Sequence, residues 1–289
     1  MSQYDYYQPE TLEEALRLKK TIPDSFFLSG GTDLMVRIKK RELRPRALIS
    51  LRCIPNLSGV KNGKIIRIGA MTSISELLKN TLLYEKYPVL IQAAKELGSV
   101  QIRNMATIGG NLCNGSPAAD MAPPLLILEA KMRLHSGQKS RDLPLEKFFQ
   151  APGEINLSPE EILADILLEP PQQDTQAIFL KKGRTKMDLA IASLAVLIRK
   201  QGNRCLKARI AAGSVAPTPV RLFDVEALLE GATFSRELLT EAQHLAAKSI
   251  SPITDVRSTA DYRCHLVEVL LKRAFEKLME RKFEDRNRT

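Results

Sequence analysis

Short helical patterns and short apolar strand patterns alternate along the first 135 residues. Residues 11–20 open with Thr11, and Glu14 follows three positions later, which is the spacing of a capped helix start. The alternation has no strict repeat of strand and helix, so it predicts a mixed α+β fold rather than a doubly wound sheet. Further strands are predicted at 25–28, 47–51, 65–69 and 131–135, and further helices at 73–83 and 88–97.

The pattern is interrupted at Pro170 and Pro171, where the polar residues 172–174 follow. Prolines and polar residues between periodic segments are typical of a domain boundary. We therefore predict one domain over 1–171 and a second over 172–289. The second is expected to contain strands at 177–181, 190–200 and 206–213, and helices at 220–229, 235–249 and 261–277.

Two segments combine glycine with small polar side chains. The first, 27–36, follows an apolar run and places Gly30-Gly31 before a helix start, with Ser29, Thr32 and Asp33 as candidate caps. The second, 106–120, holds three glycines and two asparagines. Glycine lets backbone N–H groups approach an anion, and successive N–H groups form a concave nest. The pair predicts a diphosphate held from two sides; the alternative is a polar loop at a domain edge.

Neither segment matches the common nucleotide-binding fingerprints. Residues 27–36 contain no G-x-G-x-x-G pattern, and no Gly-Lys-Ser/Thr sequence follows the glycines. The predicted ligand is therefore a diphosphate bound outside the Rossmann and Walker types.

The chain of 289 residues carries a net charge of +10. Its basic residues are spread out, with the densest runs at 37–46 and 272–288, and the second run is mixed with acidic residues. Aromatic residues make up 5% of the chain and tryptophan is absent, so it is poorly suited to stacking on nucleic-acid bases. The charge favours an acidic protein partner or a phosphorylated cofactor, and we expect no nucleic-acid binding.

The four cysteines and three histidines show no metal-binding spacing. We expect Cys53, Cys113, Cys205 and Cys264 to be reduced, buried thiols, and His265 to pack within a helix. No apolar run approaches the length of a membrane span, and the N-terminus lacks the pattern of a secretory signal, so a cytoplasmic protein without a membrane span is expected.

Four motifs in order along the chain resemble one family: 27–33, 68–72, 101–111 and 212–219. They are similar to the FAD-binding subunit of the molybdenum hydroxylases, which include xanthine dehydrogenase and carbon monoxide dehydrogenase. The resemblance implies a two-subdomain FAD-binding fold of the PCMH (vanillyl-alcohol-oxidase-like) type. Its α+β subdomains would span about 1–55 and 56–171, followed by a C-terminal α+β domain.

The resemblance also implies the residues that bind FAD. The first glycine segment and the second would hold the pyrophosphate from two sides, and Asp120 would bind an adenosine or ribitol hydroxyl. Leu163 would pack on the isoalloxazine, and Lys181, or its neighbour Lys182, would lie near the polar edge of the flavin. The alternatives are a core leucine, a surface lysine and a helix cap at Asp120. The predicted cofactor-binding residues are Phe27, Leu28, Ser29, Gly30, Gly31, Thr32, Asp33, Leu34, Thr107, Ile108, Gly109, Gly110, Asn111, Asp120, Leu163 and Lys181.

The implied function is electron transfer through FAD. Electrons from the [2Fe–2S] clusters of a small partner subunit would reach FAD and pass to NAD+ or another acceptor, while a molybdopterin-binding large subunit hydroxylates the substrate. No catalytic side chain and no metal ligand are expected on this chain. Residues 26–36 contain no histidine, so non-covalent FAD is expected. The alternatives are a free-standing flavin oxidase of the same fold and a basic binding module without enzymatic activity.

Overall fold

The computed structural model describes residues 4–137 and 139–280 and divides the chain into two compact units. Unit 1 consists of the chain up to Leu82 together with Ser99–Gly115 and Glu129–Pro170. Unit 2 consists of Leu83–Gly98, Ser116–Leu128 and the chain from Pro171 onward. Unit 2 thus takes in two segments from the first 171 residues, and the division at residue 171 stays a prediction about sequence domains.

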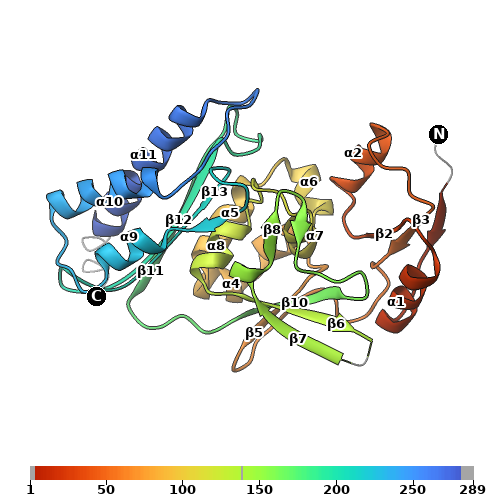
Figure 1. The fold of residues 1–289 in the computed structure, drawn as a ribbon. Coiled ribbons are helices and arrows are strands. Elements are labelled where there is room, and N and C mark those ends of the chain that lie inside the picture. The colour runs from red at the N-terminus through yellow and green to blue at the C-terminus, as the bar shows by residue number, and fades with distance from the viewer. Residues whose placement is uncertain (1–3, 138, 281–289) are drawn as a thin grey trace. The chain divides into compact units, whose positions relative to one another are not determined.

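The first sheet of unit 1 is small and parallel (Figure 1, red and orange). Its strands β1 (Asp5–Tyr7), β3 (Ala47–Ser50) and β2 (Ser25–Leu28) lie in that order. Thr11 accepts a hydrogen bond from the Glu14 N–H and caps α1 (Leu12–Thr21) as predicted. The next helix, α2 (Leu34–Lys39), begins six residues after β2 ends, so the first glycine segment connects the two elements.

The second sheet of unit 1 is antiparallel, and its central strand is buried along its whole length. Helices α3 (Ile74–Lys79) and α6 (Val100–Met105) contact each other, and α7 (Ile108–Cys113) contacts the central strand. A short hairpin of β8 (Phe149–Ala151) and β9 (Glu154–Ile155) follows the 3-10 turn Leu145–Lys147. The strand order is β4 (Val60–Lys61), β5 (Ile66–Gly69), β10 (Ile162–Leu168), β6 (Lys131–Ser136) and β7 (Lys139–Pro144).

Unit 2 is a four-stranded antiparallel sheet with helices packed against its strands. Figure 1 shows α9–α11 on one side of the strands and α5 and α8 on the other. Side chains alternate between the two faces of a strand, and Leu194, Val196 and Ile198 join the core beneath α11. The elements are α5 (Pro88–Glu96), α8 (Ala122–Ile127), β11 (Thr175–Lys182), β12 (Ala192–Gln201), β13 (Arg204–Gly213), β14 (Val220–Arg221), α9 (Phe223–Leu229), α10 (Arg236–Lys248) and α11 (Ala260–Glu280).

The mixed α+β fold class is confirmed, and two helices differ from expectation. The helix predicted over 73–83 is α3 followed by α4 (Thr81–Lys86), because Asn80 between them has extended backbone. The helix predicted over 220–229 begins as strand β14, which pairs with β13 before α9 starts. Within the described residues, no helix is both long and apolar enough to cross a membrane.

Candidate functional site

The first glycine segment is a sharp turn between β2 and α2. Gly31 has a φ of +74°, a backbone conformation that glycine adopts without steric cost. Its carbonyl accepts a hydrogen bond of 3.0 Å from the Met35 N–H in α2. Asp33 occupies the N-cap position of α2, but its side chain makes no capping hydrogen bond. Of the three candidate caps, Asp33 therefore holds the N-cap position of α2 but does not cap the helix with its side chain.

The sequence suggested that the second glycine segment is a continuous loop, but part of it forms the helix α7. Thr107 caps α7 by accepting a 3.0 Å hydrogen bond from the Gly110 N–H, and both Gly109 and Gly110 lie inside this helix. Glycine is unfavourable in helix interiors, which is why the composition indicated a loop. The cap at Thr107 and close packing outweigh that preference here.

The two glycine segments meet within unit 1. The Ser29 and Thr107 hydroxyl oxygens lie 2.5 Å apart and share a hydrogen bond. A Cβ atom at Gly30 would lie 2.0 Å from the carbonyl oxygen of Met105, the last residue of α6. At Gly110 a Cβ would lie 2.9 Å from the Thr107 hydroxyl. The backbone of Gly30 is thus brought against the backbone of Met105, 75 positions later in the sequence.

Packing inside the protein explains two of these glycines. A Cβ at Gly109 would lie 2.6 Å from the Ala70 Cβ and 2.7 Å from the Ala70 carbonyl oxygen, whose hydrogen-bond donor is the Gly109 N–H. Gly30 and Gly109 are therefore required for the two segments to pack on unit 1. The sequence interpretation had assigned glycine here to the approach of a ligand alone.

The first turn retains unused hydrogen-bond donors. Within residues 4–137 and 139–280, the structure records no acceptor for the N–H groups of Gly30, Gly31 and Thr32. These residues are partly exposed, and successive free N–H groups suit an anion such as a diphosphate. The donor set therefore fits the pyrophosphate that the sequence pattern predicts.

Leu163 lies on β10 in unit 1 and is 4% exposed. Its strand pairs it with Leu134, and a bulge follows before Asp165 pairs with Arg133. This burial is compatible with a core role, which was the alternative to contact with the isoalloxazine. Its role toward flavin stays a prediction.

Asp120 and Lys181 form a buried ion pair within unit 2. The Lys181 Nζ lies 2.7 Å from Asp120 Oδ2 and 2.9 Å from the Glu96 carbonyl oxygen, and the two side chains are 3% and 5% exposed. Lys181 is therefore not a surface lysine, whereas Lys182 is exposed. Asp120 is not the cap of α8, because Met121 holds the N-cap position. The two alternatives left open for these residues do not hold.

The second carboxylate oxygen of Asp120 is buried and has no hydrogen-bond partner among the described residues. Burial raises the pKa of Asp120 to about 6, and the Lys181 ammonium limits the rise. An unpaired buried acceptor costs free energy unless a donor reaches it. A hydroxyl group, such as those of ribose or ribitol, is a fitting donor for this oxygen.

Ser214 is a candidate that the sequence interpretation missed. It follows β13 with a φ of +64°, and its N–H donates to the Pro117 carbonyl oxygen at 2.8 Å. Its carbonyl oxygen accepts from the buried Arg263 guanidinium at 2.9 Å, while its hydroxyl is buried without a recorded partner. The motif 212–219 supported the resemblance, but a serine in a left-handed conformation leaves no periodic signal in sequence.

Two expectations about side chains are wrong. His265 is on α11, but its side chain is 64% exposed and points away from the core of unit 2. Cys53 is exposed and Cys264 is partly exposed, which contradicts the expectation, whereas Cys205 is buried and burial raises the pKa of the Cys113 thiol to about 12. All four cysteines are free. The face that His265 and Cys264 occupy on α11 depends on which elements pack against that helix, and this is not visible in the local pattern.

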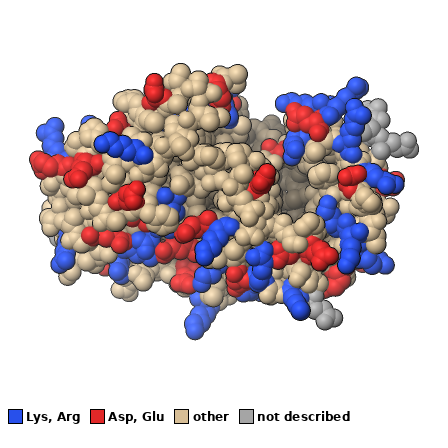
Figure 2. Space-filling model, in the orientation of Figure 1, with Lys and Arg blue, Asp and Glu red and all other residues tan. Residues whose placement is uncertain are grey.

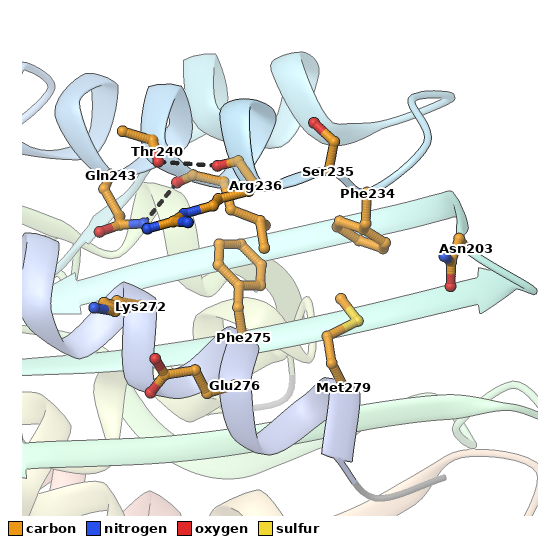
Figure 3. Close-up of a pocket in the computed structure, with 11 residues that line it drawn as sticks. Asn203, Phe234, Ser235, Arg236, Thr240, Gln243, Lys272, Phe275, Glu276 and Met279 are labelled. Atoms are coloured by element: carbon orange, nitrogen blue, oxygen red, sulfur yellow. Dashed lines mark hydrogen bonds between the residues drawn. The ribbon is translucent and has the colours of Figure 1, made fainter.

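A surface pocket of about 680 Å³ lies between α10 and α11 in unit 2 (Figure 3). Apolar side chains including Phe234, Phe275 and Met279 line it, and Arg236 and Lys272 lie among the polar residues. None of the predicted cofactor-binding residues lines this pocket.

Comparisons with known proteins cover nearly the whole chain. Residues 2–170 match the family described as the FAD binding domain in molybdopterin dehydrogenase, and residues 177–278 match the CO dehydrogenase flavoprotein C-terminal domain. The xanthine dehydrogenase FAD-binding subunit of Escherichia coli O157:H7 is 30% identical over 273 residues, which are 93% of each chain. The carbon monoxide dehydrogenase medium chain of Hydrogenophaga pseudoflava is 32% identical, covering 94% of this chain and 95% of that one.

The fold is also similar to a solved structure. The carbon monoxide dehydrogenase from Hydrogenophaga pseudoflava that lacks the Mo-pyranopterin moiety of its cofactor superposes with a TM-score of 0.94. The match covers 96% of this chain and 98% of that chain at 31% identity.

Proposed function

This chain belongs to the family of FAD-binding subunits of molybdenum hydroxylases, and we propose from that premise that it binds one FAD non-covalently and transfers electrons through it. The donor would be a partner subunit carrying [2Fe–2S] clusters, and the acceptor NAD+ or another oxidant. A third, molybdopterin-binding subunit would hydroxylate the organic substrate. Members of the family are flavoprotein subunits of oxidoreductases, so this chain is one such subunit.

The observation that supports FAD binding most strongly is the first glycine turn. The free N–H groups of Gly30, Gly31 and Thr32 form a donor set for a diphosphate. The hydrogen bond between Ser29 and Thr107 holds this turn in place, so its donors are ordered before any ligand arrives. Ordering in advance reduces the entropy cost of binding.

Unit 2, taken by itself, also carries polar groups that suit FAD. Asp120 would accept a hydrogen bond from an FAD hydroxyl through its free oxygen, and Lys181 would hold that carboxylate in position. The unpaired Ser214 hydroxyl is a second group that suits a polar atom of the cofactor. When bound, FAD supplies the reversible exchange of two electrons, and the side chains named here only bind and orient it.

The second candidate is a free-standing FAD-dependent oxidase or dehydrogenase of the same fold. The match covers 93% of a relative named as a FAD-binding subunit and 95% of one named as a medium chain, which favours the subunit. The two candidates differ in whether partner chains are required for turnover.

Reconstitution tests the proposal. The chain is purified alone and with the two co-expressed partner subunits, and FAD, iron and molybdenum are counted on each polypeptide. We expect one FAD and neither metal on this chain, weak NADH-dependent dye reduction by the isolated chain, and substrate hydroxylation only by the complex. Iron or molybdenum in stoichiometric amounts on the isolated chain, or hydroxylation by that chain alone, would overturn the proposal.

A further inference from the structure

One segment of unit 1 carries half of the excess positive charge of the chain. Residues 37–46, here called the basic arm, contain six Lys and Arg residues and one Glu, against a net charge of +10 for 289 residues. The six basic residues are all exposed. Figure 2 shows Lys and Arg side chains gathered over the part of unit 1 that holds α2. The arm is thus a predominantly positive surface, with Glu42 as its single acidic residue.

The arm is ordered although its cations repel one another. Ile38 is buried beneath it, the Glu42 N–H donates to the Arg37 carbonyl oxygen at 2.9 Å, and the Arg46 N–H donates to the Asp24 carbonyl oxygen at 3.1 Å. Within the described residues, the ion pair recorded for the arm is between Arg37 and Glu42 at 4.0 Å. Among residues 4–137 and 139–280, the other cations of the arm have no recorded carboxylate partner, so their field extends into solvent.

The composition of the arm favours a transient partner over a permanent one. Long-lived subunit interfaces have apolar centres and are depleted in lysine. Within the arm Ile38 is buried, and Val36, which is 47% exposed, lies just before the arm. Charged faces without an apolar centre speed the encounter of oppositely charged proteins more than they hold them together.

We propose that the basic arm docks the acidic face of a soluble one-electron carrier protein that accepts electrons from this flavoprotein. The inference rests on the proposed function for its electron source. Two oxidised carriers, each taking one electron, would reoxidise one FADH⁻ to FAD and leave one proton to water. The arm begins at Arg37 within α2, directly after the first glycine segment (27–36), so the docking surface is continuous in sequence with the proposed diphosphate site. Carboxylates on the carrier would supply the counter-charge that the arm lacks.

The test uses the reconstituted complex and an acidic [2Fe–2S] ferredoxin as the probe. The arm variant combines Lys39→Glu, Lys40→Glu and Arg44→Glu, three exposed side chains without a recorded hydrogen bond or ion pair. A second version with Gln at the same positions removes charge without reversing it. Stopped-flow association with ferredoxin is measured over a range of ionic strengths.

The control variant changes net charge equally elsewhere on unit 1. It combines Lys64→Glu, Lys139→Glu and Lys147→Glu, which are also exposed. We expect the arm variant to associate about tenfold or more slowly at low salt, with a flattened salt dependence, and the control to stay within about twofold of the parent. Equal slowing of both variants, or no slowing of the arm variant, would overturn the proposal.

Two further measurements distinguish carrier docking from nucleic-acid binding and from a failure to bind FAD. If a DNA duplex binds the parent complex and loses affinity in the arm variant while ferredoxin association is unchanged, the arm binds nucleic acid and the proposal is wrong. FAD content is measured on every variant. Parent protein that lacks FAD but still docks ferredoxin through the arm would refute the proposed function and leave the docking surface standing.

Discussion

The pH dependence of FAD binding gives a sharp test of Asp120. The buried carboxyl has a pKa of about 6, because burial disfavours its charged form more than Lys181 favours it. The change to be made is Asp120→Asn, which keeps the shape of the side chain and an acceptor oxygen but removes titration. If the free carboxylate oxygen accepts an FAD hydroxyl, the charged form should bind more tightly, since hydrogen bonds to charged groups are stronger.

The raised pKa predicts opposite pH dependences for the stability of the apoprotein and for its affinity for FAD. The folded apoprotein holds the proton more tightly than the unfolded chain, so the stabilising contribution is complete below pH 4 and is lost as the pH rises to 6. A rise from 3.8 to about 6 corresponds to about 3 kcal/mol of unfolding free energy. FAD affinity should change the other way and fall up to about fivefold between pH 6 and pH 5, because the ionised fraction of the carboxyl drops from about one half to about one tenth.

Both quantities are measured on the parent and on Asp120→Asn between about pH 4 and pH 8, a range that spans the ordinary pKa of 3.8 and the raised pKa of about 6. Urea unfolding of the apoprotein reports stability, and quenching of flavin fluorescence reports affinity. Subtracting the values of the variant from those of the parent, for both stability and FAD affinity, removes the contribution of other titrating groups. If that difference has no slope in either measurement, Asp120 does not titrate near pH 6. A slope in stability without one in affinity would show that Asp120 is structural and does not contact FAD.

Three further predictions concern the cofactor. Gly30→Ala should destabilise the chain by about 1–3 kcal/mol in urea unfolding and lower its FAD content, because the new methyl group would overlap the Met105 carbonyl oxygen. The control Gly63→Ala, whose new methyl group would have its nearest neighbour at 3.4 Å, should be close to neutral, and equal effects of the two changes would show that packing against Met105 does not require a glycine. Acid precipitation should release all flavin into the supernatant, and colour left in the pellet would show a covalent bond. Asp120→Ala should weaken FAD more than FMN by about 1.5–3 kcal/mol in calorimetric titration if it binds the adenosine side, and equal weakening would exclude that side.

Local pattern was sufficient for most elements of the fold. The apolar periodicity of 88–97 and the strands 190–200 and 206–213 appear as α5, β12 and β13 with shifts of a few residues at their ends. Each of these segments buries a face whose spacing is visible in the sequence. Pattern failed where a cap or a strand partner decided the outcome, as at Asn80 and at 220–221.

The candidate site was predicted by residue type and by resemblance, but its contacts were not predictable. A Gly-Gly pair predicts a turn in which a Cβ atom would be unfavourable, so Gly30 and Gly31 could be identified from the sequence. That Gly30 faces the backbone of Met105 depends on where α6 lies in unit 1. A spacing along the chain carries no information about such a neighbour.

The sequence by itself determined the elements, the glycine turns, the excess of positive charge and the family to which the chain belongs, because each depends on residues close together or on motifs in order. Only the tertiary structure decided that Ser29 meets Thr107 and that Lys181 pairs with Asp120. Those pairs join residues 78 and 61 positions apart. Burial of Asp120 beside Lys181 raises the pKa of Asp120 and leaves one of its carboxylate oxygens unpaired. Both properties arise from the exclusion of water, which only the folded chain can produce.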